Sequence, residues 1–170
     1  LSLRRQRQMC IRDSRYAALN GFKYNPPSKH PFNPLAALRM SLKEVSGDDQ
    51  LRVIDSIFKG GWSHGADLGD LPTLITLLAK ESIDGESLSH KILDLDIKEL
   101  LINETSYAIE KGVFGVPTII IDDNLFWGND QMDHIELLLD GKDPLDRERL
   151  NDQERPRAID RKAFKKQDKE

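Results

Sequence analysis

Three adjacent residues near the end of the patterned part of the chain, Gly128, Asn129 and Asp130, have the chemistry of a small-ligand site. They begin the last predicted helix, and the first turn of a helix presents free N–H groups that suit a carboxylate. The Asp130 carboxylate itself suits an ammonium group. The alternative is that Asp130 only caps the helix, a role worth about 1 kcal/mol, and one side chain can serve both roles.

Aromatic and sulfur-containing residues offer fewer possibilities. Trp62 and Phe32 are candidates for a substrate-binding pocket, although buried packing is the commoner fate of such side chains. The four histidines have no metal-ligand spacing, so we predict no metal site. Cys10 is the only cysteine, which excludes an intrachain disulfide within these residues.

Composition excludes several classes of protein. The chain has 170 residues and a formal net charge of −4, which gives no basic field to attract nucleic acid or an anionic membrane. The longest apolar runs, such as 113–121, are far shorter than the roughly 20 residues of a membrane-spanning helix. We expect a cytoplasmic protein that binds small molecules.

A series of helices is predicted before the candidate site. Asn33 and Pro34 open the first, with Leu35, Leu38, Leu42 and Val45 on one face up to Gly47. Asp48 or Asp49 caps the second, whose apolar face is Leu51, Ile54, Ile57 and Phe58 and which ends at Gly60-Gly61. Three more helices are predicted over 71–81, 86–94 and 96–111.

The pattern changes to that of strands after Gly112. The β-branched run 118–121, turn residues 122–124 and a short run 125–127 predict a β-hairpin. A last helix follows, with Met132, Ile135, Leu138 and Leu139 on its buried face. Earlier in the chain, 16–19 ends a helix at Asn20-Gly21, and 22–25 alternates like a short strand.

The two ends differ from the middle. Residues 1–14 show no periodicity and resemble the conceptual translation of a sequencing-adapter read, so we expect them to be non-native and unstructured. Residues 146–170 mix charges of both signs with few apolar residues and are predicted to be disordered.

The order of these segments resembles a known family. Three motifs in order carry the resemblance: Pro31-Phe32-Asn33-Pro34-Leu35, Gly115-Val116-Pro117-Thr118 before the hairpin, and Phe126-Trp127-Gly128-Asn129-Asp130 after it. Together they resemble the 2-hydroxychromene-2-carboxylate isomerases, a family close to the kappa-class glutathione transferases. The resemblance implies an α/β, thioredoxin-like fold of the DsbA/kappa type. The expected parts are a remnant of the thioredoxin-like domain at 15–33, an inserted all-helical domain at 34–111, and the C-terminal half of the thioredoxin-like domain at 112–145.

The resemblance also implies a cofactor and a site. Pro117 is expected to be cis, although sequence statistics alone favour a trans bond. Val116 would pair through its backbone with the cysteinyl part of glutathione, and Asn129 and Asp130 would hold its γ-glutamyl end. The family commonly has arginine after this aspartate, where the chain has Gln131. The substrate is an aromatic small molecule, and a homodimer is a possible assembly.

The same resemblance implies that the first strand of the thioredoxin-like fold, and the catalytic serine that follows it, lie upstream of this sequence. Backbone groups left without that strand cost of order 1–3 kcal/mol each when buried. We therefore expect this polypeptide to be neither stable nor active by itself; a cooperative thermal transition with stabilisation by glutathione would refute this.

Two alternatives stay open at this point. A DsbA-type thiol–disulfide oxidoreductase or a kappa-class transferase shares the fold and the proline, and the residue at the start of the first helix would separate them: Cys-x-x-Cys indicates redox chemistry, and serine indicates an isomerase or transferase. A non-catalytic helical interaction module explains the periodicity but not the two motifs that flank one hairpin.

Overall fold

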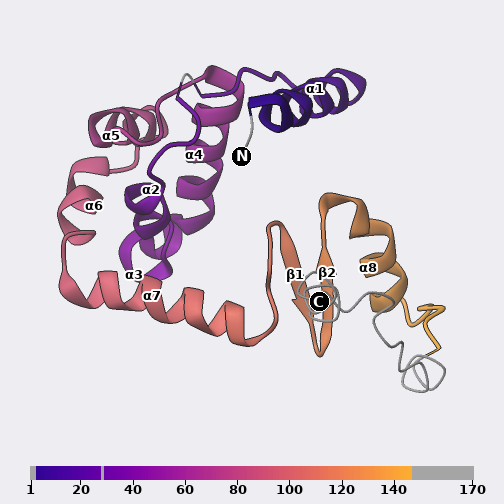
Figure 1. Ribbon diagram of the computed structural model, residues 1–170. Helices are drawn as coiled ribbons and strands as arrows, with labels where there is room; N and C mark the ends of the chain where they lie inside the picture. The colour runs from indigo at the N-terminus through magenta and orange to yellow at the C-terminus, as the bar shows by residue number, and fades with distance from the viewer. Residues whose placement is uncertain (1–2, 28, 147–170) are drawn as a thin grey trace, which may run out of the picture. The chain divides into compact units, whose positions relative to one another are not determined.

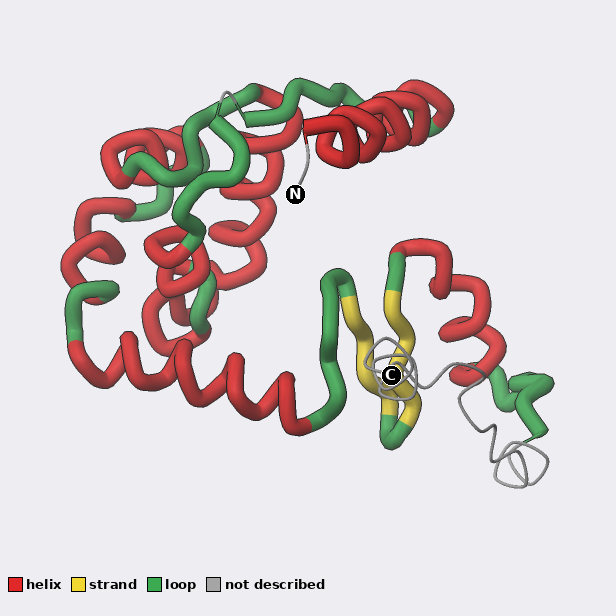
Figure 2. The backbone as a smooth tube through the Cα atoms, in the orientation of Figure 1, coloured by secondary structure: helices red, strands yellow, loops and turns green. Residues whose placement is uncertain are grey.

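The chain divides between residues 111 and 112 into two units, and each is described by itself. The computed structural model describes residues 3–27 and 29–146. Helices α1 to α7 belong to the first unit, and the strands and α8 belong to the second (Figures 1 and 2). The predicted disordered segment 146–170 lies, apart from Asp146, outside the described residues.

Helix α1 spans Leu3–Leu19, so the prediction that residues 1–14 are unstructured is wrong from residue 3 onward. The segment has no glycine or proline and is rich in Arg, Gln and Leu, which favour helices even without an apolar face. The predicted stop is confirmed. The N–H of Phe22 donates to the carbonyl of Ala17 (2.9 Å) around Gly21, whose φ is +71°, as expected for a Schellman ending.

The strand predicted over 22–25 does not form. A strand needs a neighbour for its hydrogen-bond ladder, and the described residues contain only the strands β1 and β2 of the second unit. The segment instead runs over the first unit as a loop, where the N–H of Asn25 donates to the carbonyl of Trp62 (2.7 Å). Phe22 is left 65% exposed.

The single helix predicted from Asn33 to Gly47 is two helices. They are α2 (Leu35–Met40) and α3 (Lys43–Ser46), separated by Leu42 in an extended conformation. Ala37 and Met40 are buried, while Leu35 and Leu38 are exposed. The break turns the chain so that Val45 also enters the core, and a continuous helix would not have buried these residues together.

Helix α4 (Gln50–His64) follows the 3-10 turn η1 (Gly47–Asp49) and extends beyond the predicted stop. Gly60 and Gly61 lie inside it, and the helix ends at Gly65, which is left-handed. Its buried face is Val53, Ser56, Ile57, Gly60 and Gly61. The predicted face is therefore wrong for Leu51 and Phe58, which are 78% and 62% exposed.

The reason is the close contact with α5 (Leu71–Lys80). A Cβ atom on Gly60 would lie 2.5 Å from Leu77 Cδ1, and one on Gly61 would lie 2.5 Å from Leu68 Cδ1. Gly60 and Gly61, which the sequence suggested as a helix end, instead form the surface on which α5 and the loop before it pack. The preference of glycine for helix ends is thus overridden by tertiary packing.

The next three helices were predicted correctly. Asp70 caps α5 by accepting from the N–H of Thr73 (3.0 Å), and Asp84 caps α6 (Gly85–Lys91) by accepting from the N–H of Ser87 (2.9 Å). Helix α7 (Leu95–Glu110) ends the first unit, and none of its residues is buried.

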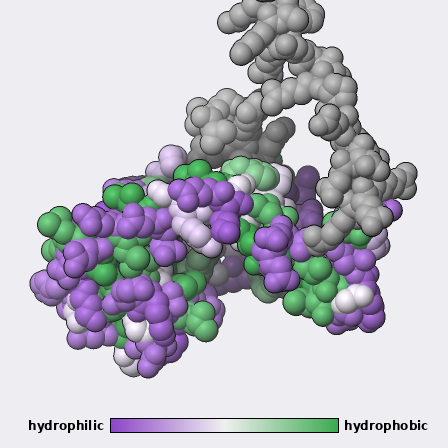
Figure 3. Space-filling model, turned by 90° about the horizontal axis from the view of Figure 1, so that it is seen from below, coloured by the Kyte–Doolittle hydropathy of each residue, from purple (hydrophilic) through white to green (hydrophobic). Residues whose placement is uncertain are grey.

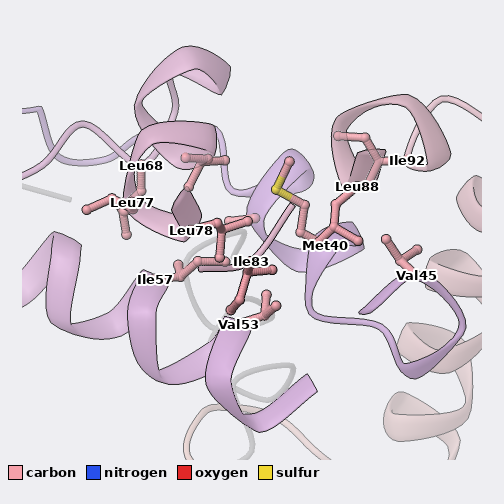
Figure 4. Packing of buried hydrophobic residues seen from close by; sticks show 12 residues of the cluster. Met40, Val45, Val53, Ile57, Leu68, Leu77, Leu78, Ile83, Leu88 and Ile92 are labelled. Atoms are coloured by element: carbon pink, nitrogen blue, oxygen red, sulfur yellow. The ribbon is translucent and has the colours of Figure 1, made fainter. Parts of the chain in front are cut away.

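The core of the first unit lies among α2 to α6 (Figure 4). Met40, Leu74, Leu78, Val45 and Val53 are its largest fully buried side chains. Because these residues come from the four helices α2 to α5, the loops between those helices are held in fixed positions.

The second unit contains the predicted hairpin and last helix. Strands β1 (Thr118–Ile121) and β2 (Asn124–Trp127) pair antiparallel, with Thr118 opposite Trp127. The 3-10 turn η2 (Asn129–Gln131) leads into α8 (Met132–Leu139), of which Ile135 is the buried residue. Met132 and Leu139, predicted to be buried, are exposed.

Apolar side chains remain on the surface of both units, as the green areas of Figure 3 show. No helix among the described residues has the length and apolar character needed to cross a membrane.

Candidate functional site

The two predicted glutathione-binding motifs meet at one end of the hairpin. The last pair of the ladder is Thr118 with Trp127, and just beyond it the N–H of Gly128 donates to the carbonyl of Pro117 (3.0 Å). The Val116–Pro117 peptide bond is cis, as the resemblance implied. One hydrogen bond therefore joins the proline loop to the turn that carries Asn129 and Asp130.

Val116 presents its backbone to solvent. The residue is 88% exposed, and in the described part of the chain no hydrogen bond involves its N–H or C=O group. It lies two residues before strand β1, which begins at Thr118. These groups have the geometry that a peptide-like ligand needs to add itself as a short strand.

The turn after the hairpin places the Asp130 carboxylate. Gly128 has φ +111°, and a Cβ atom there would collide with Oδ1 of Asp130. The carboxylate thus lies over Gly128, the residue whose N–H is hydrogen-bonded to Pro117. The residues that directly precede η2 and α8 are Gly128 and Gln131, and neither makes a side-chain cap hydrogen bond. Asp130 is exposed and accessible to a cationic group.

Gln131, where the family pattern has arginine, contacts α8. Its Oε1 atom lies 3.1 Å from Nδ1 of His134, on the exposed face of that helix. A neutral amide at this position adds no positive charge beside Asp130.

The predicted pocket residues Phe32 and Trp62 also lie close together, in the first unit. The ring of His30 contacts both, with centroid separations of 6.1 Å to Phe32 and 5.8 Å to Trp62, each edge-to-face. Phe32 and Trp62 are half-buried, so each keeps one side toward solvent. His30 was not among the predicted site residues, although its position two residues before Phe32 is visible in the sequence.

An ion pair holds the loop that carries these rings. Lys29 Nζ lies 2.6 Å from Asp67 Oδ2, and Asp67 Oδ1 accepts from the N–H of Gly69 (3.1 Å). The hydrogen bond from Lys29 lowers the pKa of Asp67 below its usual value, and the same bond raises the pKa of Lys29. Beside this pair is a polar cavity of about 280 Å³, which Phe32 also lines.

A second cavity, of about 500 Å³, lies in the second unit and includes none of the predicted site residues. It is formed by the turn end of the hairpin, Gln131 and His134, and the segment 143–145. In residues 3–27 and 29–146 no three His, Cys, Asp or Glu side chains gather as a metal site would require.

The predicted site residues therefore form two groups, one in each unit. Val116, Pro117, Asn129 and Asp130 lie together at one end of the hairpin, which we call the candidate ligand edge, and Phe32 and Trp62 form an aromatic wall with His30.

Comparison with known proteins gives consistent matches. Residues 3–140 match the DSBA-like thioredoxin domain, a range that includes most of the segment we had expected to be non-native. The 2-hydroxychromene-2-carboxylate isomerase of Pseudomonas putida is 33% identical over 85 residues, 49% of this chain and 41% of that protein. The protein of the same name from Sphingobium xenophagum is 28% identical over 94 residues, 55% of this chain and 48% of that protein.

A solved structure is similar as well. A 2-hydroxychromene-2-carboxylate isomerase superposes with a TM-score of 0.71 at 22% identity, covering 80% of this chain and 66% of that one. The chain spans less than half the length of the two curated relatives described above.

Proposed function

The chain belongs to the family of DSBA-like thioredoxin domains, and from this we propose that it acts as part of a glutathione-dependent 2-hydroxychromene-2-carboxylate isomerase. The expected DsbA-like thioredoxin fold is confirmed by the family match and the superposition. The relatives with curated names are isomerases, which favours an enzyme over a non-catalytic helical module.

One observation carries the proposal: the hydrogen bond between Gly128 and Pro117 brings an unpaired backbone edge next to a carboxylate. Glutathione has a peptide-like centre and, at its γ-glutamyl end, an ammonium and a carboxylate. Val116 would pair with the centre through N–H and C=O, and Asp130 would attract the ammonium group. Both contacts come from positions that the fold fixes, so little ordering is needed on binding.

The reaction needs glutathione as a thiolate. When bound, glutathione would supply a nucleophilic sulfur for reversible addition to the conjugated substrate, which would turn a double bond into a rotatable single bond and release the sulfur again after rotation. The serine that would stabilise the thiolate is assigned to no residue of this chain.

The substrate would need a wall for its fused aromatic ring. Within the first unit, Phe32 and Trp62 both contact His30 and present half-buried rings that suit packing against such a ring. The ion pair between Lys29 and Asp67 keeps the loop bearing Phe32 in place.

Glutathione binding by the whole chain is the direct test. We expect titration followed by 15N NMR to shift the amide signals of Val116, Gly128 and Asp130. Asp130→Ala should weaken the affinity about tenfold, as loss of a charged hydrogen bond does, and Asp130→Asn should weaken it less. Asp133→Ala, which removes an exposed carboxylate from the first turn of α8, is the matched control. Equal affinities for Asp130→Ala and the control would refute the assignment.

A further inference from the structure

Two large aromatic side chains lie exposed beside the candidate ligand edge. Phe114 is 72% exposed and Trp127 is 52% exposed, and their ring centroids are 5.0 Å apart with the planes tilted by 52°. Neither ring belongs to the groups of residues assigned above. Exposed aromatic pairs are uncommon on protein surfaces, because burying them is favourable, and they mark places where something apolar binds.

The pair is held rigidly. Gly115 lies directly against the indole, since a Cβ atom on it would be 2.6 Å from Nε1 of Trp127. The hydroxyl of Thr118 donates to the carbonyl of Gly115 (2.6 Å), and Thr118 is the ladder partner of Trp127. The loop that bears Phe114 is therefore fixed to the strand that bears Trp127, so the two rings form a preorganised surface.

This surface continues into the ligand edge. Residues directly opposite in an antiparallel ladder point to the same face, so Trp127 and Thr118 share a face with Ile120, which is 40% exposed. Phe114 is two residues from Val116, and consecutive Cα atoms are about 3.8 Å apart. A group attached to a ligand paired with the backbone of Val116 is thus within reach of the pair.

We propose that Phe114 and Trp127 form a subsite for an aromatic group carried on the sulfur of glutathione. The inference rests on the proposed function, because it takes the cysteinyl part of glutathione to lie along Val116. Because Phe114 is two residues from Val116 and contacts Trp127, a group attached to that sulfur could extend along the loop to the two rings. A flat ring attached to it packs against the exposed faces of Phe114 and Trp127, whereas a methyl group is too small to reach both.

The test compares three probes: glutathione, S-methylglutathione and S-benzylglutathione. By calorimetry on the whole chain, we expect S-benzylglutathione to bind about twofold to tenfold more tightly than S-methylglutathione, the usual gain for an aromatic contact. Phe114→Leu and Trp127→Leu should each remove most of this gain while leaving the affinity for glutathione nearly unchanged. Phe58→Leu, at a phenylalanine of similar exposure in α4, is the matched control.

A spectroscopic readout separates this subsite from the aromatic wall of the first unit. The chain has two tryptophans, so labelling with 5-fluorotryptophan gives two 19F signals, and Trp127→Phe identifies which one disappears. We expect S-benzylglutathione to shift the Trp127 signal more than S-methylglutathione does. A shift confined to Trp62, or equal affinities for the two thioethers, would overturn the subsite while leaving glutathione binding intact. Failure of all three probes to bind would overturn the proposed function, and the subsite with it.

Discussion

The N–H of Gly128 donates to the carbonyl of Pro117 across 3.0 Å, one step beyond the last pair of the hairpin. This bond fixes the distance between the backbone of Val116 and the carboxylate of Asp130, which come from two sides of the hairpin. The ligand edge is therefore a property of the strand register: a shift by one residue would separate its two halves.

Gly128→Ala is expected to weaken glutathione binding and to lower stability. The φ of +111° disfavours any residue with a Cβ, at a cost of order 1–3 kcal/mol, and the added atom would push the Asp130 carboxylate aside. Urea denaturation and a glutathione titration measure the two effects. Gly141→Ala is the control, because Gly141 also has a positive φ but no atom near the added Cβ. If both variants bound glutathione alike, the placement of Asp130 by Gly128 would be wrong.

Gly60→Ala should destabilise the first unit by about 1–3 kcal/mol, the range for overpacked cores. On an exposed helix this change would be stabilising by about 1 kcal/mol, so the sign of the effect distinguishes a helix end from a packing surface. The new methyl group would meet Leu77 at 2.5 Å. Urea midpoints give the measurement, and Gly60→Ala combined with Leu77→Ala should show a favourable coupling. A stabilised single variant would contradict the packing described.

Asp70→Ala should cost about 0.5–2 kcal/mol, as loss of a helix cap does. The carboxylate accepts from both the N–H (3.0 Å) and the hydroxyl (2.6 Å) of Thr73 at the start of α5. Asp70→Asn retains an acceptor and should restore most of the loss. Thermal unfolding followed by circular dichroism would report the differences, and equal losses for the two variants would show that capping is not the cause.

The Lys29–Asp67 ion pair should make a contribution to stability that is lost in acid. The pKa of Asp67 is lowered by its hydrogen bond from Lys29, so the contribution is present above the unfolded value of about 3.9 and disappears as the pH falls through the lower folded value. The pKa of Lys29 is raised, so its contribution is present below about 10.4 and is lost as the pH rises through the higher folded value.

The stability difference between the wild-type chain and Lys29→Met should therefore be constant near neutral pH and shrink in acid. Urea midpoints over a series of pH values measure it. In an Asp67→Asn background, Lys29→Met should have little effect at any pH, since the partner charge is gone. A difference between wild type and Lys29→Met that persisted far below the ordinary pKa of aspartate would assign the effect to packing of the lysine chain instead.

Local chemistry in the sequence determined a large part of this protein. The stop at Gly21, the helix over 71–80 and the presence of the hairpin each depend on residues within a few positions of one another, so their patterns were sufficient. The predicted turn 122–124 was one residue too long, because Asn124 already pairs with Ile121. The pairing of Val116-Pro117 with Asn129-Asp130 was predictable for the same reason, because a short hairpin joins them.

Tertiary structure decided what depends on partners distant in the chain. In α4, Leu51 and Phe58 are exposed and Gly60 is buried. The buried face is chosen by contact with α5, and this contact cannot be read from the sequence of α4 alone. Residues 22–25 alternate like a strand but find no neighbouring strand among the described residues. His30 joins Phe32 to Trp62 only through folding of the intervening loop, and the exposed pair of Phe114 and Trp127 depends on Gly115 lying against the indole. Periodicity reports how a segment could bury its apolar residues, whereas the face that is buried is set by the segment that packs against it.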